Sequence, residues 1–202
     1  MAIGYYLVTG KPQAVMVHVN VGTANGMHGL LNAARGHVPV LFTAGRTPTN
    51  EDGLAGHRSL DIHWTQEMFD QAGMLRESVK WDYELRNSQQ LETVVDRALS
   101  IAKSEPMGPV YLSLPREVLA QSMAEFTYTT PSRQHPAAPS VPNGDAADEV
   151  AALLAGAENP LIITSSAGRD PKAWSALAQF GERYALPVIQ YRNRSMSLPC
   201  NH

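Results

Sequence analysis

The chain has 202 residues, of which 44% are hydrophobic and 17% charged, which is the composition of a folded globular protein and argues against disorder. Its formal net charge of −3 argues against nucleic acid as the main partner, because a phosphate-binding surface normally needs a basic excess. No apolar run approaches about 18 residues, so no membrane span is predicted. The one cysteine, Cys200, fits a reducing compartment such as the cytoplasm.

The start of the chain has the apolar pattern of an α/β fold. Residues 3–8 fit either a first strand or the end of a helix. Residues 15–21 carry Val at every second position, which predicts a strand buried inside a parallel sheet. A polar turn at residues 22–25 breaks this strand, and apolar residues at helical spacing follow over 27–34.

The junction of this strand and helix is the first candidate site, because open α/β sheets bind ligands where a strand ends and a helix begins. His18 is the only titratable side chain of the predicted strand. It is either a buried histidine satisfied by a carbonyl or a proton donor and acceptor at a ligand site. Gly22, Thr23 and Asn25 form either a simple helix N-cap or a ligand contact, and the segment matches neither a P-loop nor GxGxxG.

The next segments continue the alternation of strands and helices. Residues 38–42 predict a second buried strand, joined to the first through one helix, as in a parallel crossover. Residues 44–60 lack periodicity and predict a long loop at a strand's carboxyl end, where function often lies. Further elements are expected as a helix over 66–75, a strand over 79–81, a helix over 87–101 and a strand over 109–114.

Composition divides the chain into three parts. Residues 1–119 form the first domain, residues 120–144 a Pro-rich linker, and residues 145–202 the start of a second α/β domain. In the last part Asp145 and Asp170 are predicted helix N-caps, and strands are expected at 161–164 and 187–189. Two strands and two helices are too few for an independent domain, so the second domain is expected to be truncated.

A metal site is not predicted. His57, Asp61 and His63 lie close together in the sequence and could suggest a metal cluster, but their spacing fits no standard zinc motif. These side chains are therefore expected to lie on a solvated surface.

Several short motifs, taken in order, resemble the amino-terminal part of the thiamine-diphosphate-dependent enzymes of the acetolactate synthase, pyruvate oxidase and benzoylformate decarboxylase group. The matching segments are residues 1–5 with 9–12, 22–26, 32–33, 38–41 with 43–45, 79–81 and 108–115. The resemblance implies an α/β fold, with a parallel-sheet pyrimidine-binding domain followed by an incomplete Rossmann-like central domain.

The resemblance also implies the cofactor. Thiamine diphosphate, bound with magnesium, serves as the electron sink for reactions of 2-oxo acids. In this family a glutamate that activates the cofactor precedes the segment matched at Met1, and the diphosphate and metal site lies in a third domain. Both are expected outside this chain, which alone is expected to be inactive. The complete protein is expected to be a homodimer or homotetramer, and FAD in its central domain is left open.

The family's site residues can be transferred to matching positions. Asn25 matches the asparagine of the turn beside the cofactor pocket, and Gly22 and Thr23 shape that turn. His18 matches an active-site histidine of benzoylformate decarboxylases, whereas Gln66 matches a glutamine that faces the active site of the synthases.

Two activities on a 2-oxo acid remain open because the chain mixes the features of both groups. Val21 stands where the synthases have a proline, and Arg46 replaces a glutamine of a GQxP-like loop. The activities are carboligation of the acetolactate synthase type and decarboxylation of the benzoylformate type. The alternative is a non-catalytic truncated product or binding module without the activating glutamate and the metal site.

Overall fold

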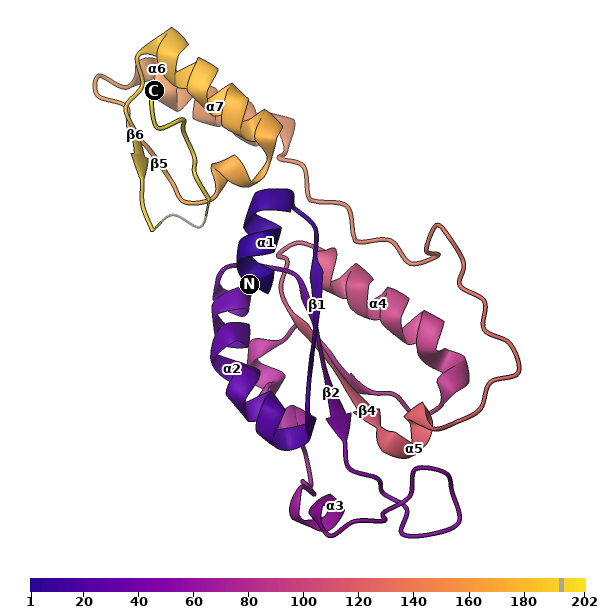
Figure 1. The fold of residues 1–202 in the computed structure, drawn as a ribbon. Helices are drawn as coiled ribbons and strands as arrows, with labels where there is room; N and C mark the ends of the chain where they lie inside the picture. The colour runs from indigo at the N-terminus through magenta and orange to yellow at the C-terminus, as the bar shows by residue number, and fades with distance from the viewer. Residues whose placement is uncertain (193–194) are drawn as a thin grey trace. The chain divides into compact units, whose positions relative to one another are not determined.

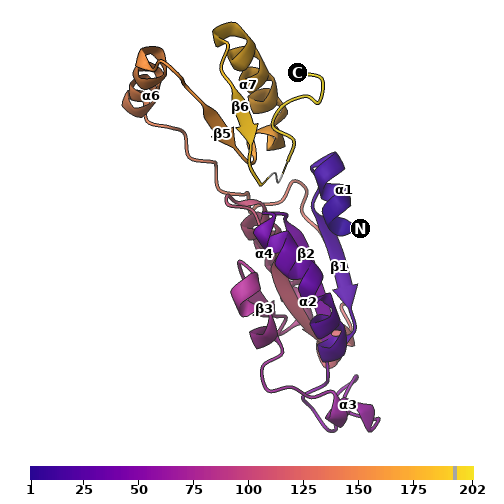
Figure 2. The same cartoon turned by 90° about the vertical axis from the view of Figure 1, so that its left-hand side faces the viewer.

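The computed structural model describes residues 1–192 and 195–202, which form two compact units divided between Pro139 and Ser140. The first unit is built on a four-stranded parallel sheet with the strand order β1-β2-β4-β3. Figure 1 labels β1, β2 and β4, and Figure 2 labels β3. Its strands are β1 (Gln13–Val17), β2 (Val40–Arg46), β3 (Asp82–Glu84) and β4 (Val110–Pro115). The predicted α/β class with a parallel sheet is confirmed.

Helices cover both faces of this sheet. Helices α1 (Ala2–Thr9) and α2 (Val19–Arg35) pack on the face that carries Phe42 and Tyr111. Helix α4 (Leu91–Lys103) packs on the other face, and Figure 1 shows α2 and α4 on opposite sides of the strands. Because both faces are covered, the ends of the strands are where polar side chains can reach a ligand.

The strand predicted over residues 15–21 is wrong in its length and its place. Strand β1 ends one residue before His18, which is the N-cap of α2, and Val19 is already helical. The Gly22 N–H donates to the His18 carbonyl at 2.8 Å and closes the first helical turn. β1 is also an edge strand that pairs with β2 alone among the described strands, and Met16 is 69% exposed.

The first apolar segment is a helix, which confirms the second of the two alternatives for residues 3–8. Helix α1 stops before Gly10, whose φ of 67° lies in the left-handed region. The Gly10 N–H donates to the Tyr6 carbonyl at 2.7 Å. A residue with a Cβ is strained in this conformation, so the glycine marks the end of the helix.

Substitution of two glycines of α2 by alanine is expected to change the free energy of unfolding in opposite directions. A Cβ on Gly26 would lie 2.5 Å from Cζ of the buried Phe42, whereas a Cβ on Gly29 would meet no atom within 4 Å. We expect Gly26→Ala to lower the free energy of unfolding by about 1–3 kcal/mol through overpacking. Gly29→Ala should raise it by up to about 1 kcal/mol, because Ala favours the helix. Urea unfolding of both variants checks this, and equal changes would contradict it.

The segment between β2 and β3 is less helical than predicted. The Asp70 carboxylate accepts the Gly73 N–H at 2.9 Å and pairs with the Arg76 guanidinium at 2.7 Å, and this local bonding competes with helix formation. In place of a helix over residues 66–75, the segment contains the short helix α3 (Ile62–Thr65) and the 3-10 turns η1 (Ala72–Met74) and η2 (Arg76–Ser78). β3 begins just after the strand predicted at 79–81.

The helix predicted over residues 87–101 is confirmed. It consists of the 3-10 turn η3 (Ser88–Gln90) followed by α4. The Asn87 side chain accepts the Gln90 N–H at 3.1 Å, so Asn87 caps the start.

Most of the predicted linker, as far as Pro139, belongs to the first unit, and its middle part lies along α4. Five hydrogen bonds join residues 128–137, which we call the strap, to this helix. They are Tyr128 hydroxyl to Asp96 (3.1 Å), Thr129 N–H to Glu92 (2.6 Å), Gln134 amide to the Thr93 carbonyl (3.2 Å), Ser100 hydroxyl to the His135 carbonyl (2.7 Å) and Ala137 N–H to the Ser104 hydroxyl (2.9 Å). The first compact unit therefore extends beyond Leu119 to Pro139.

The second unit pairs two parallel strands with two helices (Figure 2). Its elements are α6 (Gly144–Gly156), β5 (Ile162–Thr164), the 3-10 turn η4 (Ala167–Arg169), α7 (Pro171–Tyr184) and β6 (Val188–Gln190). Asp170 caps α7 as predicted, but Asn143 and not Asp145 caps α6. Among the described residues, no helix is both long and apolar enough to span a bilayer.

Candidate functional site

The candidate site lies at the carboxyl edge of the sheet in the first unit. The parallel pairing aligns the ends of β1, β2 and β4, with Val17 opposite Ala44 and Arg46 opposite Pro115. Helix α2 starts at this edge, and both ribbon views show α3 beyond it (Figures 1 and 2). The strand ends thus gather the β1–α2 turn and the loop after β2 in one region.

His18 and Asn25 form an accessible rim on the first turns of α2. Both residues are exposed, and neither side chain makes a hydrogen bond within residues 1–192 and 195–202. Val21, on the same turns, is 59% exposed and supplies an apolar surface. An imidazole, an amide and an apolar side chain together can bind a flat ring that carries hydrogen-bonding groups on its edge.

Gly22 and Thr23 support this turn from inside. A Cβ on Gly22 would lie 3.0 Å from the Val17 Cβ, so glycine allows α2 to start close against β1. Thr23 is 0% exposed, and its hydroxyl donates to the Val19 carbonyl at 2.7 Å. In this structure the Thr23 hydroxyl therefore shapes the turn and does not face a ligand.

Gln71 and Tyr111 are buried polar residues at the site that the sequence reasoning missed. Gln71 Nε2 lies 3.0 Å from the Gly45 carbonyl and 2.8 Å from the Tyr111 hydroxyl, which is 3.3 Å from Thr23 Oγ1. Burial raises the pKa of Tyr111, so the phenol stays protonated at neutral pH. Tyr111 falls in the strand predicted over 109–114, and a tyrosine in an otherwise apolar strand is the one signal that called for a polar partner.

Gln66 lies apart from this buried cluster. It is the half-buried C-cap of α3, and no hydrogen bond among the described residues joins its side chain to His18 or Asn25. Its transferred role at the active site remains a prediction.

Beside Gln66, four charged side chains alternate in sign along the sheet edge. Arg46 pairs with Glu84 at 2.5 Å and lies 3.7 Å from Glu67, which also pairs with Arg58. Burial alone would lower the pKa of Arg46, but the two carboxylates raise it above its usual value. The Arg46 guanidinium thus stays protonated, and its positive charge is balanced by the two carboxylates. These ion pairs connect the segment after α3 to β2 and β3.

Glu117, in the short helix α5 (Arg116–Leu119), organises the start of the long loop. Its Oε1 accepts the Thr49 N–H (2.7 Å), the Thr49 hydroxyl (2.6 Å), the Asn50 N–H (3.3 Å) and the Asn50 amide (3.0 Å). Burial would raise the pKa of this carboxyl, but the hydrogen bonds from Thr49 and Asn50 outweigh burial and lower it.

His63, in the short helix α3, is buried, contrary to the solvated surface expected for it. The Ser59 N–H lies 3.1 Å from its Nδ1 and the Arg116 guanidinium 3.2 Å from its Nε2. Desolvation and the positive charges of Arg116 and Arg58 lower the pKa of His63, so the imidazole is neutral at pH 7. In the part of the chain that the structure describes, no three His, Cys, Asp or Glu side chains are grouped to hold a metal ion.

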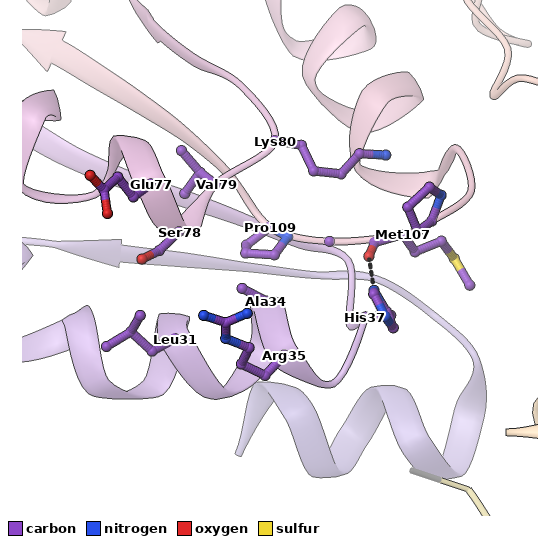
Figure 3. Close-up of a pocket in the computed structure, with 12 residues that line it drawn as sticks. Leu31, Ala34, Arg35, His37, Glu77, Ser78, Val79, Lys80, Met107 and Pro109 are labelled. Carbon is purple, nitrogen blue, oxygen red and sulfur yellow. Dashed lines mark hydrogen bonds between the residues drawn. The ribbon is translucent and has the colours of Figure 1, made fainter. Parts of the chain in front are cut away.

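A separate groove of about 260 Å³ lies at the opposite, amino-terminal edge of the sheet (Figure 3). Two of its polar side chains, Lys80 and His37, make hydrogen bonds within the fold. The Lys80 ammonium donates to the Ile101 and Ser104 carbonyls, both at 2.6 Å, and caps α4. His37 Nδ1 lies 3.3 Å from the Met107 carbonyl. The groove contains none of the predicted site residues.

Comparison with known proteins gives a consistent result. The family described as thiamine pyrophosphate enzyme, N-terminal TPP binding domain, matches residues 1–74. Benzoylformate decarboxylase of Pseudomonas aeruginosa is 28% identical over 190 residues, which cover 93% of this chain and 34% of that protein. Acetolactate synthase large subunit of Lactococcus lactis is 24% identical over 201 residues, which cover 100% of this chain and 33% of that protein.

A solved structure is similar in the same way. The benzoylformate decarboxylase of Polynucleobacter necessarius matches with a TM-score of 0.73 and 29% identity, over 93% of this chain and 33% of that one. The chain therefore spans about a third of the length of the relatives it matches.

Proposed function

From the match of residues 1–74 to the thiamine pyrophosphate (thiamine diphosphate) enzyme family, we propose that the first unit of this chain forms the pyrimidine side of a cofactor pocket in an enzyme acting on a 2-oxo acid. The observation that carries the proposal is the rim of His18 and Asn25, two accessible side chains without partners in the described residues, at the carboxyl edge of a parallel sheet. When bound, thiamine diphosphate supplies the electron sink.

We assign the residues as follows. Asn25 hydrogen-bonds the pyrimidine edge, Val21 contacts the ring face, and His18 gives a proton to or takes one from the reacting substrate. Gly22 and Thr23 hold the turn that carries all three. Gln66 contacts the substrate, and the length that the relatives have beyond this chain supplies the diphosphate and magnesium ligands.

Decarboxylation of an aromatic 2-oxo acid is the first candidate reaction, and carboligation of the acetolactate synthase type is the second. A histidine at position 18 favours the first, whereas Gln66 followed by Glu67 favours the second. Incubation of the complete protein with benzoylformate or pyruvate, with and without added thiamine diphosphate and Mg²⁺, separates the two reactions by product: CO2 with an aldehyde, or CO2 with a condensed hydroxy-oxo acid. No cofactor-dependent turnover of either acid would contradict the proposal.

The division of the cofactor pocket can be tested by thermal unfolding. We expect thiamine diphosphate with Mg²⁺ to leave the unfolding temperature of the 202-residue chain unchanged and to raise that of the complete protein, because a ligand stabilises the folded state that binds it. Mg²⁺ alone is the control. A cofactor-dependent rise in the 202-residue chain would show that it holds the diphosphate itself.

A second copy of the chain is the proposed partner, as a homodimer or homotetramer. Exposed apolar side chains on α1 and β1 support an interface there, namely Tyr5, Leu7, Val8 and Met16. A cytoplasmic location is supported by the single exposed thiol, Cys200. FAD in a central domain is a further proposal that rests on the family resemblance alone.

A further inference from the structure

A chain of hydrogen bonds lies buried beneath the rim and has one direction. The Gln71 amide nitrogen can only donate, so the Tyr111 oxygen accepts from it. The Thr23 proton is already used on the Val19 carbonyl, so the contact between Tyr111 and Thr23 is filled by the Tyr111 proton. The order is therefore Gln71 to Tyr111 to Thr23 to the Val19 carbonyl.

This series of hydrogen bonds ends at a strained residue, Val19. Val19 has a φ of 36°, in the left-handed region, which is rare for a β-branched side chain. It is only 6% exposed and directly follows His18, so its conformation sets the direction in which the rim leaves the sheet. Strained residues persist where the surrounding structure over-determines them, and here the bonds come from residues far along the chain.

We propose that Tyr111 and Gln71 are positioning residues, which hold the His18–Val19 junction through this chain and thereby set where His18 and Asn25 face the ligand. Neither residue can touch a ligand, since they are 0% and 2% exposed. The catalytic consequence rests on the proposed function, whereas the coupling of Tyr111 to the turn does not.

Gln71 also connects the end of β2 to this series of hydrogen bonds. Its amide lies 3.0 Å from the Gly45 carbonyl, one residue before Arg46 at the end of β2. A Cβ on Gly45 would lie 3.7 Å from a Val19 methyl, so Val19 packs against this strand end. Gln71 thus fixes the spacing between the rim and the end of β2.

Amide hydrogen exchange in the 202-residue chain tests the coupling without cofactor. Tyr111→Phe keeps the ring near Phe42 (centroids 6.0 Å apart) and removes only the hydroxyl. We expect it, and Gln71→Leu, to speed exchange of the Gly22 amide about tenfold or more, with the Ala98 amide of α4 changed far less. Tyr83→Phe is the control, because the Tyr83 ring stacks on Trp81 and its hydroxyl has no hydrogen bond among the described residues.

The opposite exchange results overturn the coupling. Unchanged exchange at Gly22, or a rise that Ala98 shares, means that the residues only stabilise the core.

Kinetics of the holoenzyme then test the positioning. We expect Tyr111→Phe to lower kcat about tenfold or more with KM for the 2-oxo acid within about twofold, because small misplacements of a reacting group cost rate more than affinity. Faster Gly22 exchange with unchanged kcat overturns the positioning role. Faster exchange in a protein without cofactor-dependent turnover instead contradicts the proposed function and leaves the coupling intact.

Discussion

Replacing His18 by Ala in the holoenzyme is expected to lower kcat about 100-fold or more. A positioned acid or base contributes about 10²–10⁴ to a rate, and His18 is the one titratable side chain on the exposed rim. Steady-state rates across pH with the preferred 2-oxo acid would measure the effect. His18 is an exposed N-cap without a side-chain cap bond, so the variant should fold normally.

His28→Ala is the matched control for this variant. His28 is also exposed on α2 and makes no hydrogen bond among the described residues, but it lies beyond the first turns. Its kcat should match that of the unaltered protein. Unchanged turnover and an unchanged pH profile in His18→Ala would exclude a proton-transfer role for His18.

Glu117→Ala should lower the free energy of unfolding of the first unit by about 3 kcal/mol. The substitution leaves two backbone N–H groups, of Thr49 and Asn50, without their charged acceptor, and each such loss costs about 1–3 kcal/mol. Urea unfolding measures the loss. Glu125→Ala serves as control because Glu125 is exposed and has no hydrogen bond among the described residues, and equal losses in both variants would show that Glu117 does not organise the loop.

The Glu117 effect should also depend on pH. The folded state lowers the pKa of this carboxyl, so the unfolded chain takes up its proton first as pH falls. The stabilisation is fully present above the unfolded value of about 4.3 and is lost as pH falls through the lower folded value. The difference between Glu117→Gln and the unaltered chain should therefore shrink at acidic pH.

Sequence periodicity predicted the strands that are buried inside the sheet. It failed where the secondary structure depends on contacts with residues far away in the sequence. The apolar segments at β2 and β4 both form buried strands, as predicted. β4 matches its prediction to within one residue at each end, whereas β2 (Val40–Arg46) starts later than the strand predicted over 38–42 and includes residues 44–46 of the predicted loop. The valines after β1 equally suit a strand, and what turns them into a helix is the fit of Gly22 against Val17 together with the Thr23 contact to Tyr111. Such a contact between residues 23 and 111 leaves no periodic signal.

The sequence indicated where the candidate site lies in the fold but only some of the residues that build it. A predicted parallel strand followed by a polar turn indicated the rim of His18 and Asn25, because a strand, a turn and a helix that follow one another can be recognised from the sequence. The sequence did not identify Gln71 and Tyr111, the buried residues that support the rim. Gln71 falls in a segment that looks helical by spacing, and its amide is committed to Gly45 and Tyr111 only after the fold has formed.

The strap on α4 changes where this protein can be divided by recombination. Exchange of the first unit with that of a relative at Leu119 would strip the Tyr128 hydroxyl from the buried Asp96 and the Thr129 amide from Glu92. A hybrid joined between Pro139 and Ser140 keeps the helix and its strap as one inherited piece. The unit that evolution can shuffle is thus longer than the sheet and helices alone suggest.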